Sequence, residues 1–264
     1  MTQDERLNFL IEVFRAEFKE YKKLCVPADR GGKRQLLRAL MNVRMPGPMS
    51  AEVLAVQDAY LRERAEEKGI IGLQDIPVIR NGLSVWQGDI TRLAVDAIVN
   101  AANSAMLGCF VPGHNCIDNC IQTYAGVQMR AECDRQMKLL KREYGQSYVQ
   151  PTAIPLLTDG YNLPAKKVVH IVGPVVTGPL TQKHRTELAA CYINTLDLCM
   201  REGLKSLAFC CISTGVFHFP NEEAAEIAVN TVRGWQETQG NVIECIIFNV
   251  FKDEDKKCYE NLIQ

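Results

Sequence analysis

At 264 residues the chain is long enough for one large domain, or for one domain with an extension. Apolar residues make up 47% and charged residues 23%, which allows a hydrophobic core under an ordinary surface. The net charge of −1 and the lack of a polybasic patch disfavour nucleic acid as the main partner. No run of about 18 apolar residues exists, which excludes a spanning helix. The N-terminus lacks the apolar core of a signal peptide, so we expect a cytoplasmic protein whose 11 cysteines are thiols or metal ligands.

The first 71 residues predict a helical extension. Apolar residues recur every three or four positions over residues 3–24, 33–44 and 51–68, with proline and glycine breaks between them. Ser50 can cap the third of these helices, which stops at Gly69. No chemistry is evident here, so we expect the extension to pack against the main domain.

From residue 72 onward the pattern is that of a layered α/β domain, because short apolar runs alternate with helical periodicity. The nearly continuous apolar run 242–250 indicates a strand buried on both faces. The predicted strands are 83–86, 97–99, 153–157, 167–172, 207–212 and 242–250, and the predicted helices are 115–141, 182–201, one from Pro220-Asn221 and one from about Asp253.

Three possible metal ligands lie in an eight-residue stretch of the loop that follows the second predicted strand. Cys109, His114 and Cys116 have the spacing C-x4-H-x-C, and Pro112-Gly113 can turn the chain so that Cys109 faces the other two. Thiolate and imidazole together select zinc or a similar metal, and three protein ligands leave a fourth position open for catalysis. The spacing matches no standard finger or protease signature, so two buried thiols beside an ordinary loop histidine is the competing interpretation.

Glycine-bearing loops follow two of the predicted strands, at 108–113 and 213–217. Backbone N–H groups in such loops can hold an anion such as a diphosphate, although most glycine turns are only turns. Asp89 caps its own turn or accepts from an exocyclic amine. Phe217 and Phe251 stack on a ring or, as the residues alone favour, pack in the core.

Four further polar residues lie near these loops. Asn103 ends a strand, and Asp118 lies in the first turn of a helix, where it either faces a bound sugar or interacts with the helix dipole. His170, within an apolar strand, is expected to be a satisfied core histidine, and His218 stays ambiguous.

Several short segments form a pattern that is specific as a set, although no single segment is. They are Gly88-Asp89-Ile90-Thr91, residues 96–103, Ile117-Asp118 with Ala125-Gly126, Val169-His170 with Gly173-Pro174, and residues 212–217. With these segments, residues 72–264 resemble a macrodomain, the fold that binds ADP-ribose. The resemblance implies a three-layer α/β/α domain with a mixed, largely parallel central sheet.

One segment departs from the hydrolase branch of this family. That branch usually has a run of glycines before its catalytic aspartate, where this sequence has Cys109, Val-Pro-Gly, His114 and Cys116. Together with the N-terminal extension, the departure resembles zinc-containing microbial macrodomains associated with sirtuin-type ADP-ribosyltransferases. The resemblance thus implies one Zn²⁺ per chain on these three residues, beside the anomeric carbon.

The resemblance also implies roles for the remaining site residues. Asp89 would hold the adenine amine, the Ile90 N–H would face the ring, and Phe251 would lie against it. Asn103 would bind the proximal ribose, and Asp118 matches the catalytic aspartate, acting here as a base or only as a ribose contact. The diphosphate would be cradled by the N–H groups of Ser213, Thr214, Gly215, Val216 and Phe217.

The implied function is that of a protein mono-ADP-ribosylhydrolase, which releases ADP-ribose from an acidic side chain. The resemblance points to a lipoyl-carrier protein of the glycine-cleavage type as the substrate, modified by a partner sirtuin. Competing hypotheses are a non-catalytic ADP-ribose reader and an enzyme acting on O-acetyl-ADP-ribose or an ADP-ribose phosphate. A purely structural metal is a further alternative.

Overall fold

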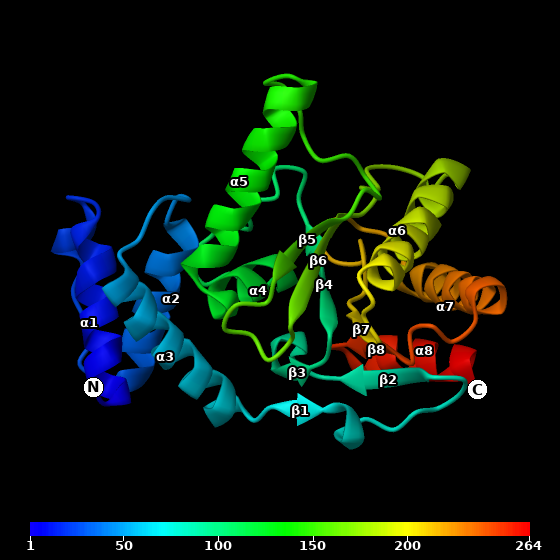
Figure 1. Ribbon diagram of the computed structural model, residues 1–264, viewed down its shortest axis with the longest axis horizontal. Helices are drawn as coiled ribbons and strands as arrows, with labels where there is room; N and C mark the ends of the chain where they lie inside the picture. The colour runs from blue at the N-terminus through cyan, green and yellow to red at the C-terminus, as the bar shows by residue number, and fades with distance from the viewer.

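The computed structural model describes all of residues 1–264, and its centre is a six-stranded sheet (Figure 1). The strands lie in the order β2-β8-β7-β4-β6-β5, and every neighbouring pair is parallel except β5 and β6. Their bounds are β2 Leu83–Gln87, β4 Ala97–Ala102, β5 Leu156–Asp159, β6 Lys167–Val172, β7 Ser206–Phe209 and β8 Cys245–Val250.

Helices cover both faces of this sheet. α4 and α5 lie on one side, and α6, α7 and α8 pack in sequence on the other (Figure 1). A single hydrophobic cluster of 49 buried residues joins the three layers, which is the α/β/α arrangement that the sequence predicts. The helices are α4 Ile117–Ala125, α5 Val127–Tyr144, α6 Gln182–Arg201, α7 Asn221–Gln239 and α8 Asp253–Ile263.

The N-terminal helices form a separate group beside α4 and α5 (Figure 1). They are α1 Gln3–Ala16, α2 Arg30–Val43 and α3 Ala51–Lys68, capped by side chains of Thr2, Asp29 and Ser50. Ten buried residues make a second hydrophobic cluster here, and Val127 of α5 is one of them. The division into domains at residue 71 stays a prediction.

Short elements connect these helices to the sheet. β1 (Ile71–Gly72) pairs in parallel with β3 (Leu93–Ala94), and the 3-10 turn η3 (Ile90–Arg92) precedes β3. Two further 3-10 turns are η1 (Tyr21–Lys23) and η2 (Leu73–Asp75). No helix combines the length and the apolarity that crossing a bilayer requires.

Several predicted elements differ from the observed ones. The first helix ends at Ala16 and not at residue 24, and Phe18 beyond it is exposed. The second helix begins at Arg30, because Asp29 caps it and its two glycines fit into the first turn. The predicted strands 153–157, 207–212 and 242–250 overlap β5, β7 and β8 with shifted ends, while 167–172 and 182–201 coincide with β6 and α6.

The predicted single helix over residues 115–141 is wrong, because the chain breaks at Gly126 into α4 and α5. Gly126 has a φ of 99°, a conformation that side chains rarely adopt. The carbonyl of Ala125 accepts from the amide of Asn162, and the N–H of Val127 donates to Gln57 Oε1. Both helix ends are therefore satisfied by partners distant in sequence.

Candidate functional site

The predicted ligand-binding residues lie at the carboxyl ends of four adjacent strands. Asp89 follows β2, Phe251 follows β8, the loop 213–217 follows β7, and Asn103 follows β4. Parallel strands end at the same edge, and three strand spacings amount to about 14 Å. The sheet therefore places these residues in a row that suits one extended ligand, at the edge where open α/β sheets bind ligands.

Asp89 stands at the β2 end of this row and is already engaged by two partners. Its carboxylate accepts from the N–H and hydroxyl of Thr91 and from Lys68 Nζ at 2.6 Å. Partial burial raises the pKa of Asp89, but these hydrogen bonds outweigh it and hold the pKa below its ordinary value. Lys68 comes from α3 and also lies over the ring of Tyr124, 3.5 Å from its centroid. Ile90, next in the chain, is buried.

Phe251 lies immediately after β8 and is 78% exposed, so the interpretation as a core residue is wrong. An aromatic ring this exposed at the row of strand ends is free to cover a bound ring. Its carbonyl accepts from Gln87 Nε2, which joins the ends of β2 and β8. Phe217 is only half-buried and packs at the margin of the core.

The loop from Ser213 to Phe217 presents unpaired backbone donors. The N–H groups of Ser213, Gly215, Val216 and Phe217 have no hydrogen-bond partner in the chain, whereas the N–H of Thr214 donates to the carbonyl of Cys211. Ser213 has a φ of 66°, which turns the backbone sharply. Such a curl of free N–H groups is suited to an anion such as a diphosphate.

Asn103 and Asp118 meet at the end of β4. Asn103 Nδ2 lies 3.4 Å from Asp118 Oδ2 and donates to the carbonyl of Gly108 at 3.1 Å. Asp118 is buried, and Asn100 Nδ2 donates to its other oxygen at 2.8 Å. Burial raises the pKa of Asp118 to about 6, although the Asn100 hydrogen bond and the charge of Arg130 oppose the rise.

The three predicted metal ligands converge. One ligand atom from each of Cys109, His114 and Cys116 lies within 4.8 Å of the others, and Cys109 Sγ is 3.5 Å from His114 Nδ1. Tetrahedral zinc with ordinary bond lengths separates a sulfur and a nitrogen ligand by about 3.5 Å and two sulfurs by about 3.8 Å. The three side chains therefore fit a zinc ion once the most widely separated ligand atoms move about 1 Å closer together.

The protonation of Cys116 depends on whether a cation is bound. Its Sγ accepts from the N–H of Asn119 at the start of α4. Burial, with the neighbouring Cys109 adding to it, raises the pKa of Cys116 to about 12. Coordination to a metal ion deprotonates a thiol, so a bound metal would lower the pKa of Cys116 and hold the residue as a thiolate.

Behind Asp118, the prediction of a satisfied core histidine is confirmed. His170 is fully buried; Asn100 Nδ2 donates to its Nδ1 at 3.0 Å, so the proton is on Nε2, 2.9 Å from the hydroxyl of Thr158. Burial lowers the pKa of His170 to about 4. His218 is exposed, and no function is assigned to it.

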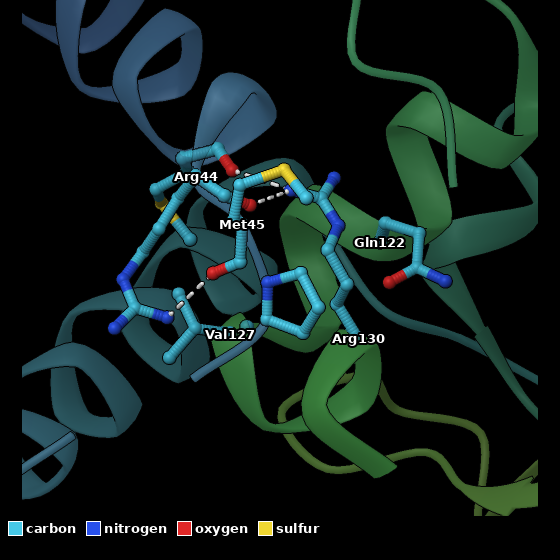
Figure 2. Close-up of a pocket in the computed structure, with 8 residues that line it drawn as sticks. Arg44, Met45, Gln122, Val127 and Arg130 are labelled. Carbon is cyan, nitrogen blue, oxygen red and sulfur yellow. Dashed lines mark hydrogen bonds between the residues drawn. The ribbon is translucent and has the colours of Figure 1, made fainter. Parts of the chain in front are cut away.

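Four contacts at the site were not expected from sequence. Lys68 reaches Asp89 from α3, Arg38 and Asn42 reach the loop 108–116 from α2, and Arg130 of α5 lies over the ring of Phe110. Only the contact of Arg130 has a sequence signal, because this cation lies on the helix face that carries the buried Met129, Cys133 and Met137. A pocket lies beside Arg130, between α5 and the end of α2 (Figure 2).

Comparison with known proteins agrees with this geometry. Residues 99–228 match the family model described as Macro domain. A protein named protein-ADP-ribose hydrolase from Treponema medium is 48% identical over the full length of both chains. One of the same name from Staphylococcus aureus (strain MRSA252) is 43% identical over 97% of this chain and 94% of its own.

A solved structure extends the match to three dimensions. The Trypanosoma brucei macrodomain in complex with ADP-ribose superposes with a TM-score of 0.65 and 27% identity, covering 86% of this chain and 95% of that one. The predictions of a macrodomain fold and of a hydrolase are thus confirmed. The chain belongs to the macrodomain family, in the group whose relatives are named protein-ADP-ribose hydrolase.

Proposed function

We propose that the chain removes a single ADP-ribose from an acidic side chain of a protein, with a zinc ion held beside the proximal ribose. The names of the relatives from Treponema medium and Staphylococcus aureus support the reaction. The observation that carries the zinc proposal is the convergence of Cys109, His114 and Cys116 on one loop. The base of that loop, at Gly108, is hydrogen-bonded to Asn103, the predicted ribose contact.

The row of strand ends would hold ADP-ribose from adenine to ribose. Asp89 would accept from the adenine amine beside Ile90, and Phe251 would cover the ring. The free N–H groups of 213–217 would donate to the diphosphate, as the unpaired donors of this loop support. Asn103 would then contact the proximal ribose at the β4 end of the row. The binding energy of these parts would position the scissile bond at the metal loop.

The bond that breaks joins the anomeric carbon to a protein carboxylate. Water supplies a hydroxyl to that carbon, and its proton ends on the released carboxylic acid or in solvent. A bound zinc ion would supply Lewis acidity and a water whose pKa is about 7. Positive charge develops on the sugar during such cleavage, and the Asp118 carboxylate, held by Asn100 and Asn103, would stabilise it or orient the ribose.

We further propose a lipoyl-carrier protein of the glycine-cleavage type as the substrate, modified by a sirtuin-type ADP-ribosyltransferase in the cytoplasm. The support is the resemblance of residues 109–116 and of the N-terminal helices to the zinc-containing microbial macrodomains. The formal net charge of −1 disfavours nucleic acid as the main partner.

The direct test combines elemental analysis with release of ADP-ribose from modified carrier protein, before and after chelation. We expect about one zinc per chain, and Cys116→Ala should lose both zinc and activity. The matched control is Cys25→Ala, since Cys25 is an exposed thiol outside the ligand set. Equal release by wild type and Cys116→Ala would refute the zinc proposal.

The same assays separate the other activities. Tight ADP-ribose binding without turnover would indicate a reader, and faster release of acetate from O-acetyl-ADP-ribose would indicate a small-molecule enzyme. If the loss of activity on chelation is matched by a parallel fall in the melting temperature, the metal is structural.

A further inference from the structure

Helix α2 of the N-terminal extension contacts the loop that carries the three metal ligands. Arg38 Nη2 donates to the carbonyl of His114 at 2.7 Å, and one turn later Asn42 Oδ1 accepts from the N–H of Gly113 at 2.9 Å. Residues at i and i+4 lie on the same face of a helix, so α2 presents both groups to the loop together. Asn42 is fully buried, and its amide also donates to Thr123 Oγ1 of α4.

Arg38 joins the two limbs of the loop. Besides the His114 carbonyl on the second limb, Arg38 Nη2 donates to Asn119 Oδ1 at 3.1 Å. Asn119 Nδ2 in turn donates to the carbonyls of Cys109 and Val111 on the first limb. One guanidinium therefore connects, through a single amide, the backbone of the ligand Cys109 with the backbone of the ligand His114.

Arg130 anchors the other end of this contact. Its guanidinium donates to the carbonyls of Met41, Asn42 and Arg44 at the end of α2, as the dashed lines in Figure 2 show in part. These carbonyls have no partner within the helix, so a buried cation there stabilises the helix end. The same guanidinium lies 4.4 Å from the ring centroid of Phe110, within the metal loop. α2 is thereby held against the loop at both ends of the contact.

We propose that α2 positions the metal-binding loop, with Arg38 as the principal positioning residue, so that the N-terminal extension is part of the metal site. The proposal rests on the proposed function in taking Cys109, His114 and Cys116 as ligands. The loop contains Gly108 and Gly113, both at positive φ, and therefore has little conformational restriction of its own. Contacts of this kind behind metal ligands typically contribute about 10- to 100-fold in metal affinity.

The test measures zinc affinity by competition with a chromophoric chelator, together with amide hydrogen exchange of residues 108–116. Arg38→Ala should weaken zinc binding at least about tenfold and speed exchange in the loop. The zinc affinity and loop exchange of Arg38→Lys should fall between those of wild type and Arg38→Ala, because an ammonium keeps the charge but not the planar fork. Arg34→Ala is the matched control, since Arg34 lies one turn earlier on α2 and bonds to Glu67.

The outcomes separate this proposal from the function on which it rests. Equal zinc affinity and equal loop exchange in Arg38→Ala and Arg34→Ala would overturn the positioning role. If wild type bound no zinc, the metal proposal would fail, but faster loop exchange in Arg38→Ala alone would still support α2 as the support of the loop. Melting temperatures and ADP-ribose affinity identify a variant that fails to fold, and in that case Arg38→Lys against Arg34→Ala decides.

Discussion

Replacement of His170 by glutamine should abolish one component of the acid sensitivity of folding. The buried imidazole is neutral, accepts from Asn100 and donates to Thr158, with a pKa lowered to about 4. A glutamine side chain also offers an acceptor oxygen and a donor NH2 group, but it does not titrate. The unfolded chain regains an ordinary histidine pKa near 6.5.

The sign and size follow from proton linkage. Between about pH 6.5 and pH 4 the unfolded state binds more protons at His170 than the native state, so acidification favours unfolding. The contribution of the neutral His170 to the free energy of unfolding is fully present above the unfolded-state pKa. It is lost as the pH falls toward the native-state pKa. The gap between 6.5 and about 4 corresponds to about 3 kcal/mol at its limit. About 2.5 kcal/mol of this is lost by roughly pH 4.5.

The assay is urea unfolding of both proteins at intervals from about pH 7.5 to pH 4.5. Other groups titrate in both proteins, so the quantity of interest is the difference between their pH slopes. Wild type should lose about 2.5 kcal/mol more of its unfolding free energy than His170→Gln over this range. Identical slopes would refute the reasoning, since His170 would then have the same pKa in the native and unfolded states.

Three further substitutions test the proposed ADP-ribose site and the helix break at Gly126. Gly173→Ala places a Cβ 2.1 Å from Ser213 Oγ and should therefore displace the 213–217 loop. Calorimetry should then show ADP-ribose binding weakened about tenfold. An unchanged affinity would contradict the proposed anion site in this loop. Phe251→Ala should lose at least about fivefold in ADP-ribose affinity while Phe251→Tyr retains it, because stacking contributes about 1–3 kcal/mol; equal affinities would show that the ring makes no contact. Gly126→Ala should lower the free energy of unfolding by at least about 1 kcal/mol, because of its positive φ and a Cβ 2.6 Å from Gln57 Nε2; chemical denaturation measures this, and a neutral result would mean that the break relaxes freely.

The elements predicted well from sequence are those whose signals are local. The helix over 182–201 has an N-cap at Thr181 and an uninterrupted period, and the strand over 167–172 is a compact apolar run. The break at Gly126 was missed because the apolar period continues through it. What stops the helix is the amide of Asn162 and the side chain of Gln57, and neither is adjacent in sequence.

The same distinction applies to the site. Cys109, His114 and Cys116 share one short loop with a proline-glycine turn, so their convergence could be predicted from spacing. Arg38 and Lys68 could not, because they approach from helices far earlier in the chain and from positions that read as solvent-facing charges. The residues alone favour a core position for Phe251, because an aromatic residue after a buried strand resembles a core residue until its neighbours are known. Only the resemblance to macrodomains places this ring against the adenine.

The interleaved strand order has a consequence for assembly. β2 neighbours only β8 in the sheet, although these segments are far apart in the chain, and the proposed ADP-ribose site includes residues that follow both strands. A partly folded molecule lacking either strand offers no complete docking surface, so nucleotide affinity belongs to the finished fold alone. A ligand present at a hundred times its dissociation constant would then stabilise that fold by about 2.7 kcal/mol, and saturation with nucleotide should protect the whole sheet from unfolding.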